Sequence, residues 1–335
     1  MEWYGRKKSS TTYKGQLRGN GLDLGALGRN TGEAIGVFSD VVTKSSPGLN
    51  GFKSSLNIHN LTQLEALLEK LYPPKWPEKV FGKPDASLVQ QGGKLFSKFQ
   101  CNLCHLSLYR TDLKTPIEAK MSPLANKGST KGIGTDPWMA CNAWSFRAPS
   151  GVLKGLDLFP NRKPIEVEDN LGDMLTATVK QALIGQGKEV VKATVVGFFG
   201  IPQSPTPTFV NAEVILGMSP KEFLKRKCET TENELLAYKA RPLTGIWATA
   251  PYLHNGSVPT LYDLLLPPAE RMQKFYVGSR EFDPKHVGFN TDPGGDNTFL
   301  IDTSVEGNRN VGHEYGVKEM TDEERNALVE YMKTL

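Results

Sequence analysis

The stretch Cys101-Asn102-Leu103-Cys104-His105 limits what this chain can fold into more than any other part of the sequence. Two thiols three positions apart, followed at once by an imidazole, form the pattern at which haem is attached covalently. Both sulfurs must reach one edge of one porphyrin while the histidine takes an axial position on the iron. The spacing therefore predicts a site for one covalently attached haem c, held by Cys101, Cys104 and His105.

The alternative for such a thiol pair is half of a zinc site, which needs a second pair of Cys or His ligands. The remaining cysteines, Cys141 and Cys228, are isolated from each other and from any histidine in the sequence. They form either one disulfide or two free thiols, and both outcomes stay open. Haem attachment is therefore the favoured interpretation.

Composition narrows the class of protein. The chain has 335 residues, of which 39% are hydrophobic and 23% charged, and its net charge of +4 is too small and scattered to suggest nucleic acid as a partner. No stretch is long and apolar enough to span a bilayer. The 33 glycines and 22 prolines predict long ordered loops between relatively few regular elements.

Covalent haem attachment normally takes place on the oxidising side of a membrane, so we expect a periplasmic or otherwise exported protein. Residues 1–8 contain a basic run, but no apolar core of a signal peptide follows it. Either a leader has been removed or the chain is a fragment of a longer protein, and we favour the fragment.

Two helices are expected to frame the haem domain. The first is capped by Asp85 and runs into the haem motif, and the last begins with a capping box formed by Thr321 and Glu324. Class I cytochromes c begin and end in a similar way, with two helices that cross. Gly92 or Gly93 would allow a close crossing, although two unrelated amphipathic helices remain the alternative. The apolar positions are Leu88, Val89, Leu95, Phe96 and Phe99 in the first helix and Ala327, Leu328, Tyr331 and Leu335 in the last.

We therefore predict a mainly α fold, a cytochrome c-like helical haem domain with long loop insertions. Residues 1–84 are expected to form an irregular N-terminal arm and a helix over 61–72, and residues 85–335 the haem domain. Helical spacing also predicts a covering helix over 167–186, and the mixed Lys and Glu residues of 221–238 favour a solvated helix.

A second informative stretch runs from Arg241 to Ser257. It combines aromatic residues with a rigid Ala-Pro-Tyr segment and an Asn-Gly turn, a composition that suits a loop lying against a haem face. Arg241 is a candidate for pairing with the propionates, because a guanidinium binds two carboxylate oxygens at once. The other candidate cofactor-binding residues of this loop are Trp247, Tyr252 and His254.

The run from Tyr238 to Leu265 resembles the haem-pocket segment of bacterial dihaem cytochrome c peroxidases, in a branch near the rubber oxygenases. Residues 29–37, 276–282 and 312–316 are similar to the same branch, so the resemblance extends over nearly the whole chain. It implies two Cys-x-x-Cys-His sites, an N-terminal one where peroxide or dioxygen reacts and a C-terminal one that handles electrons. This sequence contains only the second, so no catalytic residue is assigned.

The sixth iron ligand is left among several candidates. His313 is favoured, because it lies in a glycine-flanked loop before the last helix, and the resemblance implies that a late histidine closes the electron-transfer haem. His254 is a better candidate for a hydrogen bond to a propionate or the backbone. Further candidates are Met272, Met320 and Met332, whereas His59 and His286 are expected at the surface.

Three functions remain open. The first is an electron-transfer module that serves a redox partner protein or an N-terminal haem domain. The second is part of a dihaem peroxidase or haem oxygenase, and the third is a vestigial haem site. The sixth ligand separates the first two, because a bis-histidine iron relays electrons but is closed to peroxide.

Overall fold

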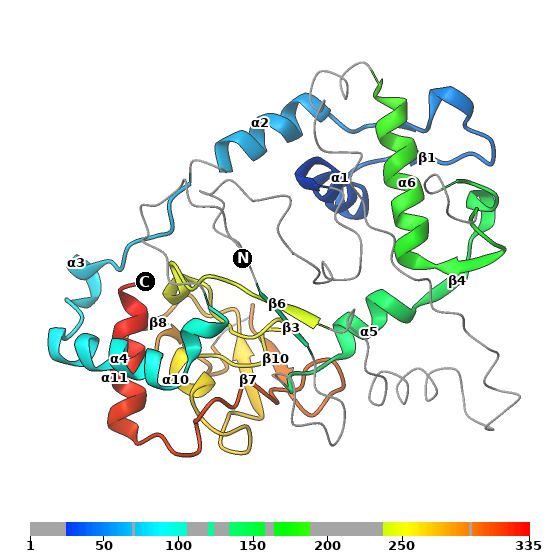
Figure 1. Ribbon diagram of the computed structural model, residues 1–335. Coiled ribbons are helices and arrows are strands. Elements are labelled where there is room, and N and C mark those ends of the chain that lie inside the picture. The colour runs from blue at the N-terminus through cyan, green and yellow to red at the C-terminus, as the bar shows by residue number, and fades with distance from the viewer. Residues whose placement is uncertain are drawn as a thin grey trace, which may run out of the picture. The chain divides into compact units, whose positions relative to one another are not determined.

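The computed structural model describes residues 25–68, 71–105, 120–123, 134–157, 164–187, 237–294 and 297–335 (Figure 1). The chain forms two compact units. The first unit gathers the described residues within Lys70–Met139 and Arg226–Leu335, and the second unit those within Leu17–Glu69 and Ala140–Lys225. The division into residues 1–84 and 85–335 stays a prediction.

The expectation of a mainly α fold is wrong. The described residues contain five two-stranded antiparallel sheets beside the helices, so the fold is mixed α/β. Strands of two to four residues are too short to show the alternating pattern that reveals a strand in a sequence. The pairs are β1 (Val41–Val42) with β2 (Lys53–Ser54), β3 (Lys120–Pro123) with β6 (Ala237–Ala240), β4 (Arg147–Pro149) with β5 (Glu168–Asn170), β7 (Lys274–Val277) with β10 (Phe299–Asp302), and β8 (Phe282–Asp283) with β9 (Gly288–Phe289).

The two helices expected around the haem motif are present in the first unit. Helix α4 (Ala86–Lys98) begins where the Asp85 carboxylate accepts hydrogen bonds from two backbone N–H groups of the first turn. Helix α11 (Asp322–Lys333) begins with the capping box predicted from Thr321 and Glu324. Each cap satisfies N–H groups that have no partner inside the helix, which fixes where each helix begins.

Helices α4 and α11 cross at a glycine. A Cβ atom placed on Gly92 would lie 2.0 Å from the backbone oxygen of Ala327 in α11. Only a residue without a side chain therefore permits this approach. Phe96 and Tyr331 pack beside the crossing with ring centroids 5.4 Å apart, as expected from the sequence.

The core of the first unit surrounds this crossing. Its buried residues come from α4, from α11 and from the segment around α10 (Leu261–Leu264). The short helix α3 (Glu78–Phe81) adds Phe81 to its edge. The fully buried members include Val258, Leu261 and Ala327. Because α4 ends at the haem motif, this core fixes the place from which the motif projects.

The second unit is built on α6 (Leu171–Gly185), which confirms the helix expected within 167–186. Helices α1 (Gly25–Val37) and α2 (Ile58–Leu68) belong to the same unit, so its N-terminal part is more regular than expected. Helix α2 begins before the predicted start at residue 61, and His59 lies exposed in its first turn. Helix α5 (Trp138–Ser145) precedes β4.

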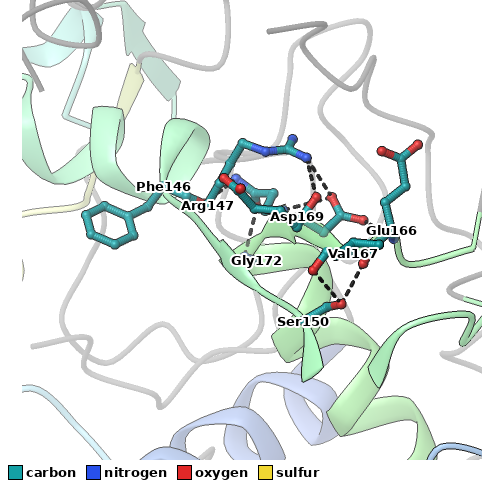
Figure 2. A network of polar contacts seen from close by, with 9 residues as sticks. Phe146, Arg147, Ser150, Glu166, Val167, Asp169 and Gly172 are labelled. Atoms are coloured by element: carbon teal, nitrogen blue, oxygen red, sulfur yellow. Dashed lines mark hydrogen bonds and ion pairs between the residues drawn. The ribbon is translucent and has the colours of Figure 1, made fainter. Parts of the chain in front are cut away.

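A polar network ties β4, β5 and the start of α6 together (Figure 2). The Arg147 guanidinium donates a hydrogen bond to the backbone oxygen of Glu168 and lies 3.8 Å from the Asp169 carboxylate. The Ser150 hydroxyl donates to the backbone oxygens of Glu166 and Val167. These bonds add to the antiparallel pairing of β4 with β5, and the Asn170 side chain accepts a hydrogen bond from the first turn of α6.

Two sequence expectations lie outside the described residues. They are most of the helix expected over 221–238 and the state of Cys228. Within the described ranges, no helix has both the length and the apolar character needed to cross a membrane.

Candidate haem site

The haem motif forms one tight turn at the end of α4. Gln100 adopts the left-handed conformation with φ 59°, which ends the helix and starts the 3-10 turn Cys101–Leu103. The backbone N–H groups of Cys104 and His105 both donate to the Cys101 oxygen, at 3.2 and 2.9 Å. The turn brings two thiols and an imidazole close together, as attachment to a single porphyrin requires.

The two motif cysteines are partly buried and form no disulfide. Burial raises the pKa of the Cys101 thiol to about 11. Cys141, in contrast, is fully buried and disulfide-bonded. In the described part of the chain, no group of three or more His, Cys, Asp and Glu side chains is arranged to hold a metal ion.

His105 is oriented by a backbone carbonyl. Its Nδ1 lies 2.6 Å from the backbone oxygen of Arg241, so in the neutral ring Nδ1 carries the proton and donates it to this oxygen. The lone pair of Nε2 is then left available for a metal. Burial lowers the pKa of His105 and so favours this neutral form.

The ring of His313 lies opposite His105. The two ring centroids are 6.1 Å apart, and the rings are inclined by 50°. An imidazole nitrogen binds a metal at about 2 Å, and adding the distance from nitrogen to ring centre on both sides gives roughly 6 Å between the centroids of two rings that share one metal. The observed separation therefore fits a single iron ion between His105 and His313.

His313 sits in a constrained and partly buried position. Its φ of 58° and the φ of 80° at Gly312 place two consecutive residues in the left-handed region, which a residue with a side chain adopts only when its surroundings enforce it. Burial, with the nearby His105 and Arg271, lowers the pKa of His313 to about 3. The ring is therefore neutral at physiological pH, as a metal ligand must be.

His254 has an unpaired nitrogen. Its ring stacks on Tyr238, with centroids 4.0 Å apart, while its Nε2 is buried and has no hydrogen-bond partner among the described residues. The Tyr238 hydroxyl donates to the backbone oxygen of Asp136. A buried polar atom without a partner is costly, so Nε2 of His254 is suited to an acceptor or donor that the polypeptide does not supply.

Asp136 anchors the neighbouring loop. Its fully buried carboxylate accepts hydrogen bonds from the backbone N–H groups of Trp138 and Gly307 and pairs with Arg309 at 2.6 Å. Asp136 therefore acts as a turn residue that leads into α5. A Cβ atom on Gly134 would lie 3.5 Å from the Cα of Gly312, so this loop adjoins the one that carries His313.

Trp247 and Tyr252 pack in the core of the first unit. The Trp247 indole N–H donates to the backbone oxygen of Pro74, and the Tyr252 hydroxyl donates to that of Val287. Their polar atoms are thus used by the polypeptide, and a contact of their rings with haem stays a prediction. The Arg241 side chain is exposed.

The other candidate ligands lie elsewhere. Met320 and Met332 are buried in the hydrophobic core, and Met272 is 41% exposed. His286 is partly exposed and lies 2.7 Å from Asp283. The structure thus brings together the haem motif, Arg241 and His313. It also reveals Arg271 and Arg325, two buried arginines that no pattern in the sequence had indicated.

One stretch of the chain matches a known protein family. Residues 237–276 match the family described as RoxA-like, cytochrome c-like. This match supports a cytochrome c-like family related to the rubber oxygenases and suggests a haem-binding electron-transfer module. A cytochrome c-like domain in turn implies haem c as the cofactor.

Two curated relatives come from Sinorhizobium fredii (strain NBRC 101917 / NGR234). The uncharacterized protein y4iJ is 31% identical over 340 residues, which cover 92% of this chain and 50% of y4iJ. The uncharacterized protein y4iM is 54% identical over 56 residues, which cover 17% of this chain and 13% of y4iM. The chain therefore spans about half the length of y4iJ.

Proposed function

We propose that this chain is a c-type cytochrome module that binds one covalent haem and transfers single electrons to a partner haem. Cys101 and Cys104 form the thioethers, His105 is one axial ligand, and His313 is the other. The observation that supports this assignment best is the separation of 6.1 Å between the rings of His105 and His313.

The residues around the site prepare both imidazoles for this task. The Arg241 carbonyl holds the Nδ1 proton of His105, which fixes the ring and raises the basicity of Nε2. His313 approaches from the other side as a neutral ring. A haem held by these two imidazoles would favour Fe(III) and would be closed to peroxide.

Two further residues fit the propionates of a bound haem. His254 offers the buried Nε2 that has no partner in the part of the chain that the structure describes. Arg241 is an exposed residue whose backbone oxygen lies beside His105, and we propose its guanidinium as a second partner. A carboxylate near either group would gain a charge-assisted hydrogen bond.

We further propose that the protein works outside the cytoplasm with a redox partner that carries another haem. The disulfide at Cys141 supports an oxidising compartment, where such bonds persist and where thioether attachment is completed. The alternative is that this chain forms part of a dihaem peroxidase or a haem oxygenase. It is favoured by one observation, the length of y4iJ, which is about twice the matched part.

Peroxide turnover separates the two functions. The protein would be produced in a host that attaches haem c, beside a variant with Cys101→Ser and Cys104→Ser as a control for attachment. We expect one haem per chain that stays with the denatured wild-type polypeptide, a low-spin ferric spectrum, and peroxide consumption no faster than in the control.

A high-spin ferric spectrum with sustained peroxide consumption would instead favour the enzyme. A colourless wild-type protein with titratable thiols at Cys101 and Cys104 would contradict both functions.

A further inference from the structure

The loop that carries His313 is held from inside by a buried arginine. Arg271 is 2% exposed, and its Nη1 donates to the backbone oxygens of Asn310 and Gly312, at 2.5 and 2.9 Å. Gly312 is the residue directly before His313. The guanidinium therefore binds the peptide group between Gly312 and His313, which sets the direction of the His313 side chain.

The other side of the same guanidinium is fixed to α10. Its Nε donates to the Leu266 oxygen at 2.9 Å and its Nη2 to the Leu264 oxygen at 3.3 Å. Carbonyls at the end of a short helix lack partners within that helix, so an arginine can satisfy them without displacing existing bonds. Arg271 thus connects a rigid part of the core to the loop by four hydrogen bonds to backbone oxygens.

A second buried arginine holds the far end of the loop. Arg325, in α11, donates to the Leu265 oxygen and to the Val317 oxygen, each at 3.0 Å. It also pairs with the Asp322 carboxylate at 2.8 Å. Arg325 therefore resembles Arg271 in burial and in its attachment after α10, but it contacts the loop four residues beyond His313.

The loop needs such support because its backbone is unfavourable. Gly312 and His313 have φ values of 80° and 58°, and Gly316 has a φ of 70° with Phe99 close against it. A non-glycine residue in the left-handed region costs of order 1–3 kcal/mol and persists only when its surroundings enforce it. Without the bonds to Asn310 and Gly312, the loop is free to relax and turn the imidazole away.

We infer that Arg271 is the positioning residue for the sixth iron ligand, and that its bonds to Asn310 and Gly312 keep His313 directed at the iron. The inference rests on the proposed function. Arg271 forms no salt bridge among the described residues, so its role is not that of an ion-pair partner.

Carbon monoxide binding to the reduced holoprotein tests the inference, because CO binds only when the sixth position opens. The variants are Arg271→Met, which keeps the side-chain volume but removes all donors, and Arg271→Lys, which keeps the charge. Arg325→Met is the matched control, and His313→Ala shows the fully open site. Optical spin state and the midpoint of chemical unfolding are recorded for each protein.

We expect wild type to be low-spin and Arg271→Met to bind CO with an apparent affinity at least about tenfold higher, because its binding-competent open state is more populated. Arg271→Lys should lie between them. Arg325→Met should unfold more easily yet keep its CO affinity within about twofold of wild type. If Arg271→Met does not accumulate as folded protein, the CO affinity of Arg271→Lys is compared with that of Arg325→Met instead. A higher affinity in Arg271→Lys supports the inference, and equal affinities overturn it.

Two results would overturn the inference but leave the proposed function standing. One is a low-spin wild type together with Arg271 variants of unchanged CO affinity, and the other is an equal gain in Arg325→Met. A wild type that binds CO as readily as His313→Ala would contradict the proposed function as well as the inference.

Discussion

Glu324 has two partners for its carboxylate, the backbone N–H of Thr321 and the side chain of Lys98. Its Oε2 accepts a hydrogen bond from the backbone N–H of Thr321, and its own N–H donates to the Thr321 hydroxyl. Its Oε1 lies 3.1 Å from the Lys98 ammonium of α4. The backbone hydrogen bond, followed by the bond to Lys98, lowers the pKa of Glu324. This residue therefore links the start of α11 to the end of α4.

The sign of the resulting pH dependence follows from linkage. Because the pKa of Glu324 is lower in the folded protein, its contribution to stability is present above the ordinary value of 4.5 and is lost as the pH falls through the lower folded value. Glu324→Gln should therefore lower the free energy of unfolding near neutral pH and flatten its decline below pH 4.5.

Chemical unfolding from neutral to acidic pH measures this effect, with Glu323→Gln as the control. Glu323 is an exposed carboxylate one residue earlier in the same helix. If the free energy of unfolding of Glu324→Gln falls with pH as steeply as that of wild type, the Glu324 carboxylate does not stabilise the fold.

At the scale of single residues, local patterns could be read from the sequence. The haem motif and the capping box at Thr321 each depend on neighbours within a few positions, so their chemistry is visible in the chain itself. Two other interactions depend on tertiary contacts. They are the hydrogen bond from His105 to the Arg241 oxygen and the hydrogen bond from Arg271 to the Gly312 oxygen. A backbone oxygen as a partner leaves no trace in residue types, and neither arginine role could be predicted.

Helices α4 and α11 are the elements on which the site depends, and they cross closely at Gly92. Ala in place of Gly92 would put its Cβ 2.0 Å from the Ala327 oxygen, so the helices must separate. A Cβ on Gly93 would meet only the edge of the Tyr331 ring, at 3.3 Å. The two adjacent glycines therefore differ sharply in what they tolerate.

We expect Gly92→Ala to destabilise the protein by about 1–3 kcal/mol through overpacking, despite roughly 1 kcal/mol of added helix propensity. Gly93→Ala gains the same helix propensity, and its Cβ meets only side-chain atoms of Tyr331. Its stability should therefore stay within about 1 kcal/mol of wild type. Chemical unfolding of both variants measures the difference. Equal stabilities of Gly92→Ala and Gly93→Ala would contradict the close approach of α4 and α11 at Gly92.

Long amphipathic elements were the ones that sequence patterns predicted well. The helices α4, α6 and α11 each repeat their apolar positions over three turns or more, and two carry recognisable caps. The short strands carry no such repeat, and they pair segments as distant as β3 and β6. The predicted fold class was wrong because these pairings arise from tertiary contacts between loops.

On the scale of the whole molecule, the haem motif and His313 belong to the first unit, together with α4, α10 and α11. This unit contains both proposed axial ligands and both arginines that hold the loop between residues 310 and 317. In the proposed assignment, both iron ligands therefore come from the same unit of this chain. Its electron donor and acceptor would then contact an already closed haem.

The central claim is that His105 and His313 bind the same iron. Near-infrared magnetic circular dichroism of the ferric holoprotein tests it directly, because the charge-transfer band of low-spin haem reports the two axial ligands. The predicted result is the signature of two neutral imidazoles, lost in His313→Ala and restored by added imidazole. An imidazole–thioether signature, or a high-spin spectrum in the wild type, would contradict the claim.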